Sequence, residues 1–206
     1  MANTSKSGNV VKHCLKIPRI KGDRRTSEWA LRKLWCKKWN DKGAFPINPE
    51  TAWILGLYCA EGNSDNSIYF TLHENEVEYQ QRIISTFTAL GYNVSTKHIV
   101  ENHCVCIYIC TVQLAEKFKQ EFGSHAINKS IPQDILFHKD DNVLINFLRG
   151  YCCGDGHYSA HDSKISFKTA SKTLALQLQL AFARLGIFCH ICKGYRKPSY
   201  IQGRKV

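Results

Sequence analysis

The apolar positions of the chain change between helical and strand spacing, which predicts a mixture of helices and strands. Apolar residues three or four positions apart indicate helices, alternation indicates strands, and glycines mark the helix ends. The elements expected in the first part are a helix at 51–63 that stops at Gly62, a strand at 67–73, a helix at 75–92 that ends at Gly91, a hairpin at 93–111 with its turn near Glu101, Asn102 and His103, and a helix at 112–123 that ends at Gly123.

The same order of elements then begins again. The second series is expected to hold a helix at 142–157, a strand at 164–170, a helix at 171–187 ending at Gly186, and then the start of a second hairpin. Both restart helices end in a carboxylate followed by glycine, at Glu61-Gly62 and Asp155-Gly156, and the two carboxylates are 94 residues apart. Such an internal repeat predicts two similar halves packed together. We divide the repeat into a first half, 51–140, and a second half, 141–206.

Residues 1–50 form a basic extension ahead of the repeat. Within it, TSEWALRKLWCKKW at 26–39 predicts a short basic helix, and the prolines and glycine of 40–50 predict a linker. The chain carries a net charge of +11, distributed as +8 over 1–50, −4 over 51–140 and +7 over 141–206. Two basic ends around an acidic middle favour a polyanionic partner bound by defined surfaces, although a basic protein without such a partner would show the same total.

The cysteines and the N-terminus indicate an intracellular protein. The start, MANTSKSGNVVKHC, lacks the apolar core of a secretory signal, and no apolar run reaches the ~18 residues of a membrane span. The ten cysteines are therefore expected to be reduced thiols. Cys189 and Cys192 form the only C-x-x-C pair, which argues against a structural zinc site. Cys104, Cys106 and Cys110 have the spacing of one strand face, and we expect them to pack in the core.

Small residues in the two restart helices predict that these helices pack closely. Gly56 lies four positions before Ala60, and Gly150 lies four positions before Gly154, so each pair shares one helix face. A carboxylate at a helix C-terminus is unfavourable unless a cation is close, because that end already carries about −0.5 charge. If the helices pair, Glu61 and Asp155 converge, and carboxylates with exposed backbone carbonyls suit Mg²⁺. The alternative is two acids that point into solvent.

These residues resemble a known family. ILGLYCAEG at 54–62 and LRGYCCGDG at 148–156 resemble the two signature helices of the LAGLIDADG homing endonucleases. NKSIPQDIL at 128–136 resembles the Lys-x-Ile-Pro block of the intein-type (DOD-type) branch, and TASKTLALQLQLAFARLGI at 169–187 resembles the block after the second helix. The blocks occur in the family's order and cover about residues 51–190.

The resemblance implies an α+β fold of two αββαββα halves related by a pseudo-twofold axis, with the signature helices at their interface. It implies a monomeric, Mg²⁺-dependent enzyme, encoded in an intron or similar to the nuclease of an intein, that cleaves both strands of a long DNA site. The residues that match the signature carboxylates are Glu61 and Asp155, with the carbonyls of Ala60 and Gly154 beside them as further metal ligands. Lys129 matches the lysine that assists catalysis, although it could equally be an ordinary surface lysine.

The chain departs from the family pattern in two places. Glu61 replaces the aspartate of the first signature, which lengthens the side chain by one methylene. The symmetric counterpart of Lys129 would fall at position 223, beyond Val206, so we expect the second half to lack its last strand and helix. The chain begins with Met and ends in RKV without a terminal His-Asn, and on that ground we expect a free-standing protein and not an intact intein.

In a fold of this kind, antiparallel strands lie in the major groove and alternate residues reach the bases. The candidate DNA-contacting residues are Lys97 and His98 in the first half, and Lys164, Ser166, Lys168, Lys193, Arg196 and Lys197 in the second half. Two alternatives to the nuclease stay open. One is a non-catalytic nucleic-acid binder, such as an intron RNA maturase or a DNA-binding regulator, and the other is an unstable remnant with an exposed sheet edge.

Overall fold

The computed structural model describes residues 14–15, 45–161, 163–194, 200–201 and 204–205, with side chains for 45–161 and 163–194. The predicted helix at 26–39 lies outside this part of the chain. Two short strands, β1 (Cys14–Leu15) and β2 (Phe45–Pro46), pair antiparallel ahead of the repeat. No helix in the described ranges has both the length and the apolar composition needed to cross a membrane.

The first half has the complete αββαββα order. Its elements are α2 (Pro49–Glu61), β3 (Gly62–Ser64), β4 (Ile68–His73), α3 (Val77–Ala89), β5 (Val94–Ile99), a 3₁₀ turn (Val100–Asn102), β6 (Cys104–Ile109) and α4 (Val112–Phe122). The strands form one antiparallel sheet in the order β3-β4-β6-β5. The predicted hairpin and its turn are therefore confirmed, and β3 is an additional strand that the analysis of apolar spacing did not include.

The second half repeats the first part of this order. After a connection with a 3₁₀ turn (Ala126–Asn128) and α5 (Gln133–Leu136) come α6 (Asp141–Asp155), β7 (Gly156–Ser159), β8 (Lys164–Phe167) and α7 (Lys172–Arg184). The strand predicted at 164–170 is shorter than expected. Past α7, the described residues hold only β9 (Tyr200–Ile201) and β10 (Arg204–Lys205), which pair with each other and not with the β7–β8 sheet.

The two halves have the same register at their first hairpin. Gly62, the first residue after α2, pairs with Phe70, and Gly156, the first residue after α6, pairs with Phe167. The next pair outward is Asn63 with Tyr69 in the first half and His157 with Ser166 in the second. The repeat read from the sequence therefore extends to individual strand pairs.

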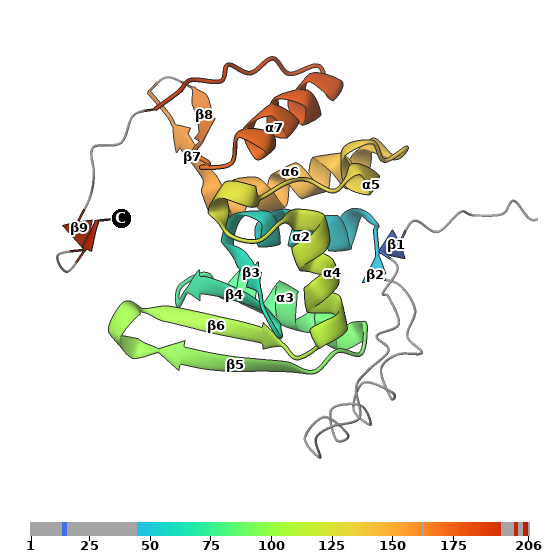
Figure 1. The fold of residues 1–206 in the computed structure, drawn as a ribbon, viewed down its shortest axis with the longest axis vertical. Helices are drawn as coiled ribbons and strands as arrows, with labels where there is room; N and C mark the ends of the chain where they lie inside the picture. Colours follow the sequence, from blue (N-terminus) through green and yellow to red (C-terminus); the bar gives the residue numbers. More distant parts are fainter. Residues whose placement is uncertain (1–13, 16–44, 162, 195–199, 202–203, 206) are drawn as a thin grey trace, which may run out of the picture.

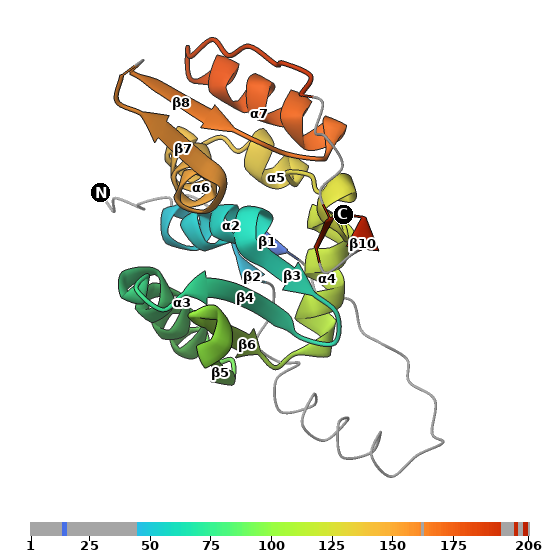
Figure 2. The same ribbon diagram turned by 90° about the vertical axis from the view of Figure 1, so that its left-hand side faces the viewer.

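Helices α2 and α6 lie side by side at the centre of the molecule (Figures 1 and 2). The sheet of the first half lies on one side of the helix pair, and β7–β8 with α7 lies on the other (Figure 2). A Cβ on Gly56 would meet the carbonyl oxygen of Phe147 at 1.9 Å, and a Cβ on Gly150 would meet that of Trp53 at 1.8 Å. The glycines thus allow two helix backbones to approach closely, as their spacing predicts.

The start of α2 corrects the predicted linker. The side chain of Asn48 accepts hydrogen bonds from the backbone N–H groups of Glu50 and Thr51, and the Thr51 hydroxyl accepts one from the N–H of Asn48. Pro49 occupies the first helical position, where its missing N–H costs nothing and its fixed φ suits the helix. The helix therefore begins at Pro49, inside the segment that its prolines marked as linker.

The core lies between α2 and the first-half sheet, with α3 and α4 packed around it. Inward-facing residues of β4 and β6 alternate along each strand: Ile68, Phe70 and Leu72, and Val105, Ile107 and Ile109 are all buried. The opposite face of the sheet, here called the outer face, carries the residues between them: Asn63, Tyr69, Thr71, His73, Ser95, Lys97, Ile99, Cys104, Cys106 and Tyr108.

The cysteines of β6 lie on the outer face and not in the core. Cys106 is buried there, with its sulfur 3.5 Å from the Thr71 hydroxyl, while Cys104 is half-buried. Cys110 lies past the end of β6 and is exposed. The expectation that all three pack in the core is therefore met only by the burial of Cys106, because the alternation of β6 directs Val105, Ile107 and Ile109 toward α2. The eight cysteines with described side chains are all free thiols.

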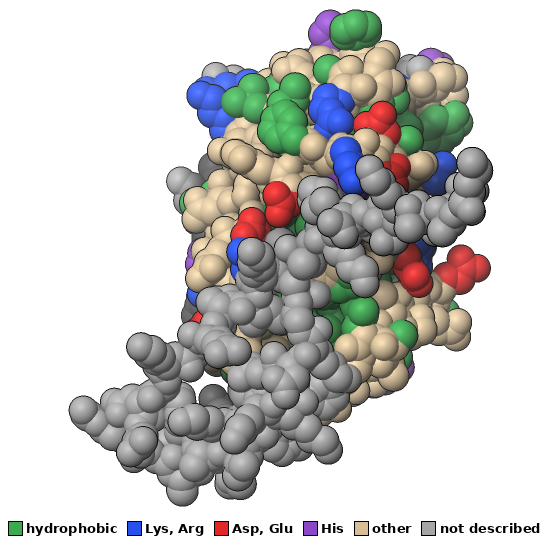
Figure 3. Space-filling model, turned by 90° about the vertical axis from the view of Figure 1, so that its right-hand side faces the viewer, with side chains coloured by type: hydrophobic (Ala, Val, Ile, Leu, Met, Phe, Trp, Pro, Cys, Tyr) green, Lys and Arg blue, Asp and Glu red, His purple; other side chains and the backbone are tan. Residues whose placement is uncertain are grey.

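The second half leaves apolar side chains exposed where the first half covers them. In the first half, α3 packs against β5 and β6, whereas no described strand takes that place beside α7. Figure 3 shows hydrophobic side chains gathered at the upper end of one face, over the second half. The exposed apolar residues of this half are Tyr158, Ile165, Leu176, Leu180, Ile187, Phe188 and Ile191.

Candidate active site at the paired helix ends

Glu61 and Asp155 are the last residues of α2 and α6, and the packing of these helices brings them together. A Cβ on Gly154 would lie 2.5 Å from the Cβ of Ala60 and 2.9 Å from the Cγ of Glu61, so the two helix ends touch. Each helix passes directly into a strand at the glycine that follows, with extended φ values of −88° for Gly62 and −79° for Gly156. The site thus joins two helix C-termini, each carrying a carboxylate.

The pKa values of both carboxylates are raised. Partial burial raises the pKa of Glu61 first, and the charges of Asp155 and Glu76 raise it further. Burial also raises the pKa of Asp155, against the opposing effects of Tyr151 and Lys129. Glu61 is exposed and Asp155 is half-buried, so both remain accessible from outside. Asp155 therefore differs from the alternative of an acid that points freely into solvent, whereas Glu61 is exposed.

Lys129 supplies the cation that the helix ends require. Its Nζ donates hydrogen bonds to the carbonyl oxygens of Gly62, at 2.7 Å, and Tyr58, at 3.3 Å, and lies 4.4 Å from the centre of the Tyr58 ring. The residue is only 8% exposed, so it is not an ordinary surface lysine. Burial lowers the pKa of Lys129, while Cys59 and Asp155 raise it. The ammonium group therefore neutralises part of the negative potential at the end of α2.

Two further residues near the carboxylates, Cys59 and Tyr151, were not predicted as site residues from the sequence. Burial raises the pKa of the Cys59 thiol to about 12, although Lys129 opposes this shift. The buried Tyr151 hydroxyl has no hydrogen-bond partner of normal geometry, and burial together with Asp155 raises its pKa. Both residues follow the apolar pattern of their helices, so no sequence signal separates them from core residues.

The donor set fits a hard divalent cation. Two carboxylates at adjoining helix ends, with the last carbonyls of those helices beside them, match the one or two protein carboxylates that Mg²⁺ takes along with water and phosphate. In the described ranges no three His, Cys, Asp or Glu side chains converge at one point, so the site offers a carboxylate pair and not a closed cage. A second positive charge here would relieve the repulsion that raises the pKa of Glu61.

The structure separates the two DNA-contact candidates of the first half. Lys97 pairs with Cys106 and lies on the outer face, whereas His98 pairs with Val105 and lies on the core-side face of the same strand. Both side chains are exposed, because β5 is the last strand of the sheet. Tyr69 and Tyr108, whose ring centres are 6.0 Å apart, share the outer face with Lys97. Sequence alternation alone could have found these tyrosines.

The candidates of the second half lie partly on one face. Lys164 and Ser166 alternate on β8 and pair with Ser159 and His157, so they face away from Phe167 and the core. Lys168 follows the end of β8 and is exposed, and Lys193 is exposed in the segment after α7. Arg196 and Lys197 lie outside the described residues.

Comparison with known sequences finds similarity over parts of the chain. The family model for a LAGLIDADG-like domain matches residues 142–205. The chain is 34% identical over 169 residues to the ATP-dependent DNA helicase Hel308 of Thermococcus kodakarensis, which covers 78% of this chain but 15% of the helicase. It is 30% identical over 135 residues to the replication factor C small subunit of Methanocaldococcus jannaschii, covering 54% of this chain and 7% of that protein. The chain therefore spans a small part of each relative.

Comparison with solved structures gives the same fold. The N-terminal LAGLIDADG domain of DUF199/WhiA superposes with a TM-score of 0.51 at 16% identity, covering 84% of this chain and 83% of that one. I-DmoI in complex with DNA and Mn superposes with a TM-score of 0.51 at 12% identity, covering 69% and 80% of the two chains.

The two-half architecture and the convergent helix ends define a protein of the LAGLIDADG fold. This chain carries that fold with both signature helices, α2 and α6, at the interface between its halves.

Proposed function

We propose that this protein is a site-specific DNA endonuclease of the homing endonuclease type, which hydrolyses phosphodiester bonds of a long double-stranded target with Mg²⁺. The observation that carries the proposal is the convergence of Glu61 and Asp155 at the touching ends of α2 and α6. The structural similarity to I-DmoI, named a homing endonuclease and solved with DNA, supports it.

In this proposal the residues of the chain divide the chemistry among them. The carboxylates of Glu61 and Asp155, with the carbonyls of Ala60 and Gly154, would hold Mg²⁺. When bound, such an ion activates water and stabilises the leaving oxygen. The Lys129 ammonium, held at the end of α2, compensates the added negative charge of the phosphate backbone at the site. The outer face of the first sheet and the matching face of β7–β8 would align the duplex along the two halves.

The two sequence relatives are proteins of different kinds, and this supports the proposal that the chain corresponds to a module carried by different proteins. A helicase and a replication factor subunit share with this chain only 15% and 7% of their own lengths. A nuclease segment of the intein-type (DOD-type) branch, carried within unrelated proteins or encoded in an intron, accounts for this distribution. We therefore propose neither helicase nor replication activity for this chain. Two signature helices in one chain allow the protein to act as a monomer, and we place it inside the cell.

Cleavage tests the proposal directly. The protein is incubated with a library of long duplexes in Mg²⁺ or in a chelator, and the ends produced are sequenced. We expect defined double-strand breaks in Mg²⁺, and a loss of at least about 100-fold in rate for Glu61→Gln and for Asp155→Asn. Glu78→Gln, which neutralises an exposed carboxylate on α3, is the matched control and should cleave normally. Full activity in both site variants would refute the proposal.

One observation favours a second candidate, a nucleic-acid binder without cleavage activity. The Lys129 Nζ is occupied by two backbone carbonyls, so its ammonium stabilises the helix end even without a phosphate. An intron RNA maturase or DNA-binding regulator would keep this arrangement for stability alone. Metal-independent binding of RNA or of a DNA operator, without nicking in Mg²⁺, would establish this function instead.

A further inference from the structure

The segment that carries Lys129 lies between the two halves of the molecule and is hydrogen-bonded to both. It connects the 3₁₀ turn Ala126–Asn128 to α5, and it has no helix or strand of its own. On the side of the first half, the N–H of Ser130 donates to the carbonyl of Phe122 at 2.9 Å, and the Ser130 hydroxyl donates to that of Glu121 at 3.2 Å. The end of α4 therefore holds one side of the segment.

Helix α7, which belongs to the second half, holds the other side. The Ser171 hydroxyl donates to the carbonyl oxygen of Lys129 at 2.7 Å, and Ser171 is only 1% exposed. Gln177, two turns along the helix, binds both backbone groups of Ile131: its Oε1 accepts from the N–H at 2.7 Å, and its Nε2 donates to the carbonyl at 2.9 Å. A side-chain amide that binds both the N–H and the carbonyl of one residue in this way fixes both the position and the orientation of that residue's backbone.

We propose that Ser171 and Gln177 are positioning residues that hold the Lys129 ammonium at the end of α2. The carbonyl oxygen of Lys129 is held by the second half, while its Nζ reaches the first half at Gly62 and Tyr58. The cation at the site is consequently set by how α7 docks, so the two halves must be correctly placed for Lys129 to be in position. This inference rests on the proposed nuclease function only for its effect on cleavage.

The variants must separate this role from the capping of α7, because the Ser171 hydroxyl also accepts a hydrogen bond from the N–H of Leu174. Ser171→Gly removes the donor to Lys129, but glycine is nearly as good an N-cap and costs the helix little. Ser171→Thr keeps both the cap and the donor and serves as the matched control. Gln177→Met removes both bonds to Ile131 at similar length and helix propensity, so it tests the same role without touching the cap.

The Tyr58 ring provides a readout that does not depend on activity. Because the Lys129 Nζ lies over this ring, its ε-methylene signal should be shifted upfield in a spectrum of protein labelled with ¹³C-lysine. The signal is assigned by its absence in Lys129→Arg. In Ser171→Gly and in Gln177→Met we expect it to move more than halfway toward the position of solvent-exposed lysines, and in Ser171→Thr to stay. An unmoved signal in both Ser171→Gly and Gln177→Met, in folded protein, would overturn the inference.

Cleavage under single-turnover conditions then separates the two proposals. If both hold, Ser171→Gly and Gln177→Met cleave about tenfold or more slowly at unchanged DNA affinity, since small displacements of a catalytic group are costly, while Ser171→Thr restores the rate. A displaced lysine signal with normal cleavage supports the positioning role and removes Lys129 from the proposed mechanism. If the wild-type protein cleaves no DNA, the proposed function fails, and the lysine signal still decides the inference.

Discussion

Gly56 and Gly150 face each other's helices across the interface of the two halves, each against the backbone of the opposite helix. Gly56 lies against Phe147 and Tyr151, and Gly150 lies against Trp53 and Leu57. The contacts are reciprocal, as a pseudo-twofold axis between α2 and α6 requires. The distance between the helix axes, and with it the meeting of Glu61 and Asp155, depends on the absence of a side chain at both positions.

Gly150→Ala should therefore destabilise the protein by about 3 kcal/mol, because the added Cβ meets backbone atoms that cannot move aside. Chemical unfolding measures the loss. Gly194→Ala is the control, because a Cβ at Gly194 meets nothing within 4 Å and the residue has an ordinary φ. A loss at Gly150 no larger than the loss at Gly194 would contradict the prediction, because it would mean that α2 and α6 can move apart at little cost.

Much of the fold and the centre of the site could be predicted from the sequence because the same pattern of residues occurs in both halves. The carboxylate-glycine pairs gave the ends of α2 and α6, and the four-residue spacing of small residues gave their close packing. Gly91, Gly123 and Gly186 were correctly assigned as helix ends, and their φ values of 79°, 78° and 77° are ones that glycine adopts without strain.

Other features could not be predicted because they depend on register or on distant contacts. Lys97 and His98 are adjacent in sequence, so only one of them can face outward with the rest of the outer face. Cys106 lies on the outer face because its neighbours Val105 and Ile107 fill the core. The partners of Lys129 and of Gln177 come from elements 42 to 71 residues away, and no local pattern records them. By contrast, the start of α2 could have been predicted from the sequence, because Asn48 is a common N-cap residue and Pro49 suits the first turn of a helix.

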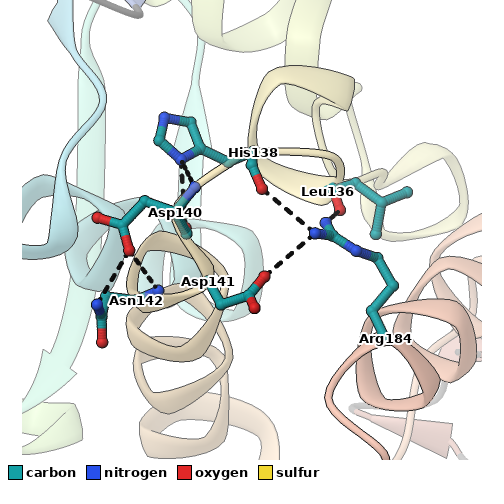
Figure 4. Close-up of polar contacts among 6 residues, drawn as sticks. All are labelled: Leu136, His138, Asp140, Asp141, Asn142 and Arg184. Atoms are coloured by element: carbon teal, nitrogen blue, oxygen red, sulfur yellow. Dashed lines mark hydrogen bonds and ion pairs between the residues drawn. The ribbon is translucent and has the colours of Figure 1, made fainter.

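Arg184 should contribute to stability through its carbonyl contacts and not through its ion pair. Its guanidinium donates to the carbonyls of Leu136 and His138, which end the connection between the halves, and it also pairs with Asp141 at 3.2 Å (Figure 4). The ion pair is largely exposed on the Asp141 side. We expect Arg184→Ala to cost about 1–2 kcal/mol, and Arg184→Lys to recover little, because lysine lacks the planar fork.

Asp141→Asn is the companion variant for this test. It removes the exposed charge pair and leaves both carbonyl contacts, so the expected loss is below about 0.5 kcal/mol. Thermal unfolding of the three variants distinguishes the contributions. Equal losses in Arg184→Ala and Asp141→Asn would show that the ion pair dominates.

Lys97 and His98 form a natural pair of variants for DNA binding, because they are neighbours on opposite faces of β5. If the outer face contacts DNA, Lys97→Ala should weaken binding of a cleaved target and reduce the slope of log affinity against log salt by about 1, as for the loss of one phosphate contact. His98→Ala should leave both quantities unchanged. Fluorescence anisotropy over a range of salt concentrations measures them, and the reverse result would place DNA on the other face.

Glu61→Gln should raise stability in the absence of metal, in a pH-dependent manner. Because the pKa of Glu61 is raised in the folded protein, the native state binds its proton more readily than the unfolded state does. Stability therefore falls as pH rises from the ordinary pKa of a glutamate through the raised one, and the full loss is present above it. Glutamine removes this loss, so the variant gains at pH 8 and gains nothing at pH 4. Since Glu61 is exposed, the gain should be small, about 0.5 kcal/mol.

Magnesium should reverse the order of the two proteins. An ion that binds the folded state stabilises it by RT ln(1 + c/Kd), where c is the free ion concentration, and Glu61→Gln removes one of the two carboxylates that would hold it. Melting curves at pH 8 with a chelator and with increasing Mg²⁺ should therefore cross: the variant melts higher without metal, and the wild type gains more with it. An equal Mg²⁺ response in both proteins would show that Glu61 is not a ligand. If the variant melts no higher in the chelator, the partial burial of the Glu61 carboxylate and its repulsion from Asp155 cost the folded protein nothing.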